Sequence, residues 1–426
     1  MNTTLRKVIY EPLVSGELHA VVPDFTIEAA DGNITAPASL HFSPQGGYIF
    51  ELHFLEKNVP TVLQSHSSGT FGAADRVKIT GQIEGEIRFS ADVFPSNHNK
   101  MRSRGTSTAT FTAGRLHLDA EGTDLMSQSE VRGLLGSPSS DEETSPHGFS
   151  AHLIFHGPKL HLLNSGTKIL RTNHFLGESS SSSFDTHQFA GEGWEAALIQ
   201  NGEELHLHIR NQKSSEVIVE APEDLVDRIA FAVAFTHGFR PWPVYRELRV
   251  NHRIVERWLS DHLNLGQSSL APVSARLGIS ARSSEEPQLM EIIPKIADGL
   301  GRIPSDHFCS IEQLIWNVLS ADLGDLPPAT QLLIVCSALD GLMKVIGGDQ
   351  KDTLKVWKSA AQITGLSWEN WLSDIMDIRK KHRDNLSHGR LWILEEISNE
   401  VFYQDYPQLG GAFMAVIAAY CGYDGP

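Results

Sequence analysis

The stretch ITGQIEGEIRF, Ile79–Phe89, indicates the fold class of the first half of the chain. Its apolar residues recur so that Ile79, Ile83 and Ile87 can share one face of a β-strand. Similar short runs, separated by Gly, Asn, Asp and Pro, follow one another over the first ~250 residues. This pattern is typical of a sandwich or barrel, and we expect a β-sandwich-like domain. The serine-rich segment 177–185, GESSSSSFD, predicts an exposed loop within it.

The second half of the chain has the periodicity of helices instead. Residues 328–347, PATQLLIVCSALDGLMKVIG, and residues 367–382, SWENWLSDIMDIRKKH, have the length and apolar spacing of amphipathic helices. Residues 265–286 are mostly small and polar, which indicates a linker. We therefore predict an α+β multidomain protein with a β-rich domain over 1–264, a linker over 265–286 and an all-α bundle over 287–426.

The overall composition narrows the class of protein. Of the 426 residues, 41% are hydrophobic and 20% are charged, which is ordinary for a soluble globular protein. The formal net charge of −17 argues against a broad surface that coats nucleic acid. The apolar runs are shorter than the roughly 18 residues that span a bilayer, and the first residues lack the apolar core of a signal peptide. We expect a cytoplasmic protein without membrane contact. The 3 widely spaced cysteines predict neither a disulfide framework nor a zinc knuckle.

Positive charge is concentrated in one stretch of this acidic chain, IRKKHRDNLSHGR, Ile378–Arg390. The simplest interpretation is a solvated helix end whose cations complement the helix dipole. A second interpretation starts from Arg383 and His388, which lie close together near a helix junction. A guanidinium donates two parallel hydrogen bonds to a phosphate, and an imidazole transfers protons near neutral pH. Together they could cleave RNA without a metal, by attack of the 2′-hydroxyl on the adjacent phosphorus.

The order of these residues resembles a motif of a known family. RDNLSHG contains an Arg, a polar residue directly after it, and a His separated from the Arg by four residues. It resembles the R-x4-H motif of the HEPN superfamily of α-helical RNases, and the resemblance covers Pro287–Tyr423. Asp340, within LLIVCSALDGLMKV, matches an acidic residue that these bundles often carry in an earlier apolar helix. The resemblance implies an endoribonuclease whose two motifs meet across the two-fold axis of a homodimer.

The resemblance also implies a role for each charged residue. Arg383 stabilises the transition state, His388 acts as acid or base, and Asp340 orients one of them by a charge-assisted hydrogen bond. The alternative for Asp340 is a helix-surface carboxylate, and Asp384 either orients the pair or caps the helix end. The candidate catalytic residues are Arg383, His388, Asp340 and Asp384. The candidate RNA-binding residues, whose alternative is a solvated surface, are Arg379, Lys380, Lys381 and Asn385.

The order of the two domains is similar to that of ApeA-type bacterial anti-phage proteins. That resemblance implies a defence effector that cleaves RNA, with transfer RNA as a candidate, to arrest translation in infected cells. The β-rich domain would then sense an unidentified phage-derived trigger. Two alternatives stay open: a non-catalytic HEPN protein for dimerisation and RNA binding, and a β-sandwich ligand-binding protein with a helical oligomerisation domain.

The β-rich half is also dense in histidine and aromatic residues. In ELHLHIR, His206 and His208 share one face of a predicted strand, as zinc-binding pairs do. No Cys or Asp/Glu cluster completes a recognisable spacing, so we expect no metal site and no cofactor. Phe239, Trp242 and Tyr245 could stack a ligand or an RNA base, but packing between the sandwich and its helix is the favoured interpretation.

Overall fold

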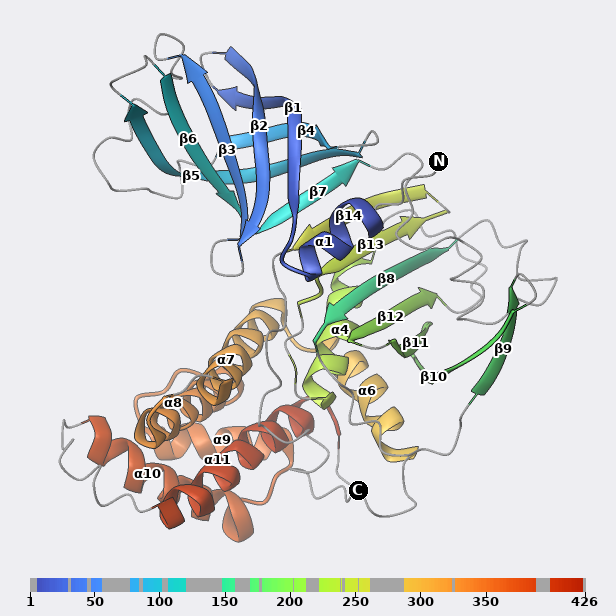
Figure 1. Ribbon diagram of the computed structural model, residues 1–426. Coiled ribbons are helices and arrows are strands. Elements are labelled where there is room, and N and C mark those ends of the chain that lie inside the picture. Colours follow the sequence, from blue (N-terminus) through green and yellow to red (C-terminus); the bar gives the residue numbers. More distant parts are fainter. Residues whose placement is uncertain are drawn as a thin grey trace.

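A computed structural model confirms the predicted α+β class. A β-rich N-terminal part, blue to yellow in Figure 1, is followed by a helical C-terminal part, orange to red. The structure describes residues 6–29, 32–43, 47–55, 77–83, 87–101, 106–119, 148–157, 169–175, 178–201, 203–211, 222–237, 239, 242–251, 253–260, 287–323, 326–387 and 399–423.

The first strands of the chain pair into a closed antiparallel ring. They are β1 (His19–Ala29), β2 (Gly32–Ser43), β3 (Gly47–Leu55), β4 (Val77–Ile83), β5 (Ile87–Met101) and β6 (Thr106–Ala113). Their hydrogen-bonded order, β4-β1-β2-β3-β6-β5, closes because β4 also pairs with β5. The rings of Phe25, Phe50, Phe89 and Phe111 are buried together in the interior. The pattern that is typical of a sandwich or barrel therefore forms a barrel here.

The stretch Ile79–Phe89 forms a hairpin of two strands rather than one long strand. β4 ends at Ile83 and β5 begins at Ile87, and these two residues pair with each other. All three isoleucines of the stretch are buried, as their spacing predicts. Gly81 pairs with Phe89, and a Cβ at Gly81 would lie 2.7 Å from the Phe89 ring. The close approach of the two strands therefore requires glycine at this position.

The remaining strands extend the sheet away from the barrel. They are β7 (Arg115–Asp119), β8 (Phe149–His156), β9 (Ile169–Phe175), β10 (Glu178–Gly191), β11 (Trp194–Asn201), β12 (Glu204–Asn211), β13 (Tyr245–Val250) and β14 (Arg253–Ser260). Their order, β7-β14-β13-β8-β12-β11-β10-β9, continues from the pairing of β5 with β7. The prediction of a loop over 177–185 is wrong, because residues 178–184 pair with β9.

Both faces of this extended sheet are buried near β8. Helix α4 (Glu223–His237) covers one face, where Leu153 of β8 and Leu207 of β12 belong to the same hydrophobic core as the helix. On the opposite face, Ile154 and Tyr245 belong to the barrel core. The N-terminal π-helical turn η1 (Arg6–Tyr10) and helix α1 (Glu11–Val14) contribute to that core.

The C-terminal part is a bundle arranged around one apolar helix. Its elements are α6 (Pro287–Leu300), α7 (Ser305–Leu323), α8 (Pro328–Gly347), α9 (Thr353–Thr364), the π-helical turn η5 (Trp368–Leu372), α10 (Ser373–Ser387) and α11 (Asn399–Tyr420). Helix α8 is central because α7, α9, α10 and α11 all pack against it. Among the described helices, α8 alone is long and apolar enough to cross a membrane, and 56% of that apolar window is buried inside the protein.

The hydrophobic cores divide the chain at a different place from the predicted linker. Helix α6 packs against α4 and β10, and Trp194 Nε1 of β11 donates a 2.8 Å hydrogen bond to Asp298 Oδ1 of α6. One continuous core therefore joins β8 and β10–β13 to the helical bundle, whereas the barrel has a core of its own. The predicted linker, 265–286, lies outside the described residues.

Candidate active site

The candidate site is built on Asp340, a carboxylate inside the helical bundle. The side chain of Asp340 on α8 is 8% exposed, between the buried residues Leu339 and Leu342. It accepts hydrogen bonds from Trp357 Nε1 of α9 at 3.2 Å and from Arg379 Nε of α10 at 3.0 Å. Its Oδ2 atom also accepts from Arg379 Nη2 and from Nη1 of Arg383 on α10. Asp340 is therefore a buried acceptor, which excludes the helix-surface alternative.

Two arginines reach this carboxylate because they lie one helical turn apart on α10. Positions four residues apart share a face of an α-helix, so both Arg379 and Arg383 face α8. The two guanidiniums differ in their exposure: the Arg379 side chain is 6% exposed and the Arg383 side chain is 40% exposed. Asp340 neutralises one positive charge, and the excess charge is located at Arg383, the guanidinium that also contacts solvent.

A buried thiol lies in the same part of the bundle. Cys336 is one turn before Asp340 on α8, and its Sγ atom lies 3.9 Å from the carbonyl oxygen of Arg379. Burial raises the pKa of Cys336 to about 12. The thiol is therefore protonated at neutral pH, which makes it a poor nucleophile. Cys336 is a free thiol in this structure.

A second carboxylate, Asp405 of α11, holds the same turn of α10 from the other side. His382 Nε2 lies 2.6 Å from Asp405 Oδ2, and Lys381 Nζ donates to the same oxygen at 3.1 Å. Burial alone would raise the pKa of Asp405, but the hydrogen bonds and charges of His382 and Lys381 hold this pKa below its usual value. Asp405 is therefore ionised at neutral pH and anchors α10 to α11.

The structure sorts the candidate RNA-binding residues into different environments. The prediction for Arg379 is corrected: its guanidinium is buried and paired with Asp340, so it does not lie on a surface that RNA could contact. Lys380 and Lys381 are exposed. Asp384 and Asn385 lie in α10, and their side chains are outside the description.

The catalytic candidates are only partly brought together. Asp340 and Arg383 are in contact, through the charge-assisted hydrogen bond that the sequence analysis expects for one member of the pair. His388 lies outside the described residues, which stop at position 387 at the end of α10. Sequence reasoning missed His382 and Asp405. The signal for His382 was its spacing of three residues from Arg379, which places both on the buried face of α10.

The aromatic residues near β13 have a packing role. Phe239 and Tyr245 are buried, and the Trp242 ring lies 4.3 Å from that of Trp316 on α7. Phe239 also contacts Phe155 of β8 edge to face. These contacts join the sheet to the helices, as the favoured interpretation of this aromatic stretch expects.

Comparison with protein-family models, with curated proteins and with solved structures found no match for this chain. The chemistry of the site therefore rests on its own geometry. A buried carboxylate holds an arginine whose remaining N–H groups reach solvent, beside two exposed lysines. This arrangement suits a phosphate or another small oxyanion at the C-terminal end of α10. Only one group of described residues could hold a metal ion, three histidines on β8 and β12.

Proposed function

We propose that the chain is a metal-independent endoribonuclease of the HEPN type, a cytoplasmic anti-phage effector that acts as a homodimer. The observation that carries this proposal is the contact between Asp340 and Arg383. Asp340 accepts from one nitrogen of the guanidinium, and a guanidinium has five N–H donors. The remaining donors of Arg383 are available at a side chain that is 40% exposed. An oriented arginine of this kind stabilises the charge that develops on a phosphate during cleavage.

The proposed reaction is transesterification within the RNA strand. The 2′-oxygen forms a bond to the adjacent phosphorus, and the bond from phosphorus to the 5′-oxygen of the next nucleotide breaks. The products are a 2′,3′-cyclic phosphate and a 5′-hydroxyl. Arg383 donates hydrogen bonds to the phosphate oxygens, while His388 takes the proton from the 2′-hydroxyl or gives one to the leaving oxygen. Two copies across a two-fold axis would supply two imidazoles, so that one acts as base and the other as acid.

The exposed lysines next to the arginine support a polyanionic substrate. Lys380 and Lys381 follow the buried Arg379 directly, and both project from α10 into solvent. Lys381 also pairs with Asp405, which fixes its position on the bundle surface. Backbone phosphates on either side of the cleaved bond are the groups that such lysines attract. The net charge of −17 over the whole chain limits this attraction to the neighbourhood of α10.

The test compares RNA from cells that express the wild type, Arg383→Ala, His388→Ala or Lys380→Ala, with and without phage. We expect new 2′,3′-cyclic phosphate ends in the wild type and their loss, by ~100-fold or more, in the first two variants. Lys380→Ala is the matched control, because it removes an exposed cation of the same helix and should reduce cleavage only modestly. Unchanged RNA ends in a strain whose wild type still blocks phage would refute the nuclease.

A non-catalytic role in RNA binding is the second candidate, and one observation favours it. Asp340 binds the buried Arg379 and Trp357 in addition to Arg383, so this carboxylate also holds three helices together. A purely structural network of this kind needs no chemistry at Arg383. In that case purified protein would retain RNA in a filter-binding assay without cleaving it, and Arg383→Ala would weaken binding without changing the RNA ends.

A further inference from the structure

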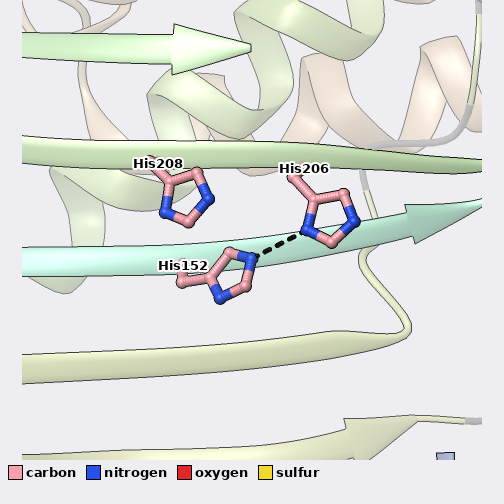
Figure 2. Close-up of side chains that lie close together, drawn as sticks. All are labelled: His152, His206 and His208. Carbon is pink, nitrogen blue, oxygen red and sulfur yellow. Dashed lines mark hydrogen bonds between the residues drawn. The ribbon is translucent and has the colours of Figure 1, made fainter. Parts of the chain in front are cut away.

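Three histidines of the extended sheet meet on one face of two neighbouring strands. β8 and β12 are antiparallel, and their register places His208 opposite His152 and His206 opposite Ile154. His206 and His208 share a face because side chains alternate along a strand. Figure 2 shows the three rings gathered together, with His152 Nε2 lying 3.1 Å from His206 Nδ1. One ring nitrogen of each residue lies within 4.8 Å of the other two.

One ring nitrogen of His208 has no hydrogen-bond partner among the described residues. His208 is 7% exposed, and its Nε2 atom is buried without a hydrogen bond. Buried polar atoms almost always have a partner, so this nitrogen is available to a ligand from outside the chain.

His206 has the hydrogen-bonding arrangement of a metal ligand. Its Nε2 atom lies 2.9 Å from Glu204 Oε2, which leaves Nδ1 directed at His152. Metal-binding histidines commonly donate their second ring N–H to a carboxylate in this way. Two imidazoles bound to one zinc ion at about 2.0–2.1 Å have donor nitrogens about 3.3 Å apart at the tetrahedral angle. The observed 3.1 Å between His152 Nε2 and His206 Nδ1 is close to that value.

We propose that His152, His206 and His208 bind one divalent transition-metal ion, with zinc as the preferred ion. The residue across the strand from His152 is Glu247, whose carboxylate accepts from Tyr245 Oη at 2.6 Å and from Arg257 Nε at 2.8 Å. Because these bonds engage Glu247, the fourth coordination position is left for water or an exogenous donor. The site lies in the β-rich half, apart from α10, so it adds a metal to the protein without entering the proposed RNA cleavage.

The ion would link two strands that the sequence separates widely. β8 and β12 lie in the middle of the extended sheet, and the opposite face of that sheet packs on α4. A bound ion would therefore stabilise the sheet that joins the barrel to the helical bundle. An open fourth position would also make this half of the protein responsive to a small metal-binding ligand.

The test uses the full-length protein, freed of metal by a chelator and then titrated with zinc. We expect one equivalent of zinc per chain, measured by mass spectrometry of the metal after gel filtration. His206→Ala and His208→Ala should weaken binding at least tenfold in competition with a chromogenic chelator. His156→Ala is the control, since it removes an imidazole of β8 outside the group. Wild-type binding by His206→Ala and His208→Ala would overturn the site.

A spectroscopic measurement on the wild type decides the question without any substitution. Zinc X-ray absorption should show imidazole nitrogens in the first shell at about 2.0–2.1 Å, and cobalt in place of zinc should give the intense visible bands of four-coordinate geometry. A protein that retains no zinc, or a cobalt spectrum of six-coordinate geometry, would overturn the proposal. Circular dichroism identifies any variant that fails to fold. RNA cleavage is not read out, so failure here leaves the proposed nuclease untouched.

Discussion

Replacing Asp340 by alanine should destabilise the protein by about 3–5 kcal/mol, because it leaves a buried cation without its partner. The guanidinium of Arg379 is 6% exposed and hydrogen-bonds Asp340 through Nε and Nη2, so its charge would stay in the bundle uncompensated. The broken contact with Arg383 adds less than about 1 kcal/mol to this loss of stability, since water can solvate a side chain that is 40% exposed. The Trp357 N–H loses one hydrogen bond to a carboxylate, worth about 1.5–3 kcal/mol. The buried charge of Arg379 therefore dominates the loss.

The same reasoning predicts which second substitution restores stability. Arg379→Met removes the buried charge, so the double variant Asp340→Ala/Arg379→Met should be more stable than Asp340→Ala alone by about 2 kcal/mol or more. Asp340→Asn retains an acceptor for Trp357 and should lose less than Asp340→Ala. Asp377→Asn is the matched control: this carboxylate is exposed on α10, and its loss should change stability by less than about 0.5 kcal/mol.

Urea unfolding followed by circular dichroism measures these differences, because the bundle contributes most of the helical signal. The reasoning is refuted if Asp340→Ala unfolds at the same urea concentration as Asp377→Asn. It is also refuted if the stability loss of the double variant equals the sum of the losses of Asp340→Ala and Arg379→Met. Additive losses would mean that the two side chains do not interact.

Two further predictions concern α11 and the residue Cys421 that follows it. The pKa of Asp405 is lowered in the folded state, so its ionisation stabilises the protein at neutral pH, and this stability is lost as the pH falls below the ordinary value of 3.8. Asp405→Asn should therefore lower the melting temperature most at pH 7, and a difference from the wild type that persists undiminished at pH 3 would contradict this. Gly299→Ala should cost about 1–3 kcal/mol, since the added Cβ would lie 1.9 Å from the Cys421 carbonyl oxygen. In the control Gly341→Ala, the flexible end of Leu314 can move aside, so an equal loss in thermal melts would refute the steric argument.

The sequence was sufficient to predict the α+β class. It was not sufficient to predict that strands β1–β6 close into a barrel. Local spacing identifies which residues of Ile79–Phe89 are buried, because strand periodicity depends only on near neighbours. It cannot show that β4, besides forming a hairpin with β5, also pairs with β1, since that pairing joins segments far apart in the sequence. The serine run was misjudged for a related reason. Backbone pairing with β9 forms a strand at residues 178–184 despite a composition that is typical of loops.

The side-chain contacts of the candidate site could likewise be predicted only in part from the sequence. The resemblance identified Asp340 and predicted that it orients Arg383 or His388, and the structure shows its contact with Arg383. The second partner, Arg379, was assigned to RNA binding because it lies outside the motif, in a run of cations whose alternative is a solvated surface. Likewise, His152 could not be joined to His206 and His208 before the register of β8 and β12 was known.

The cations of α10 lie in three different environments, which bear differently on the two interpretations of this basic stretch. An arginine needed only for packing would be buried with a carboxylate, as Arg379 is. A cation needed only for solvation or for the helix dipole would be exposed at the helix surface, as Lys380 is. Arg383 satisfies neither description, because it binds the buried Asp340 and still exposes 40% of its side chain. A guanidinium fixed on one side and open on the other can bind a phosphate, so replacing Arg383 is the substitution that best separates the proposed function from stability.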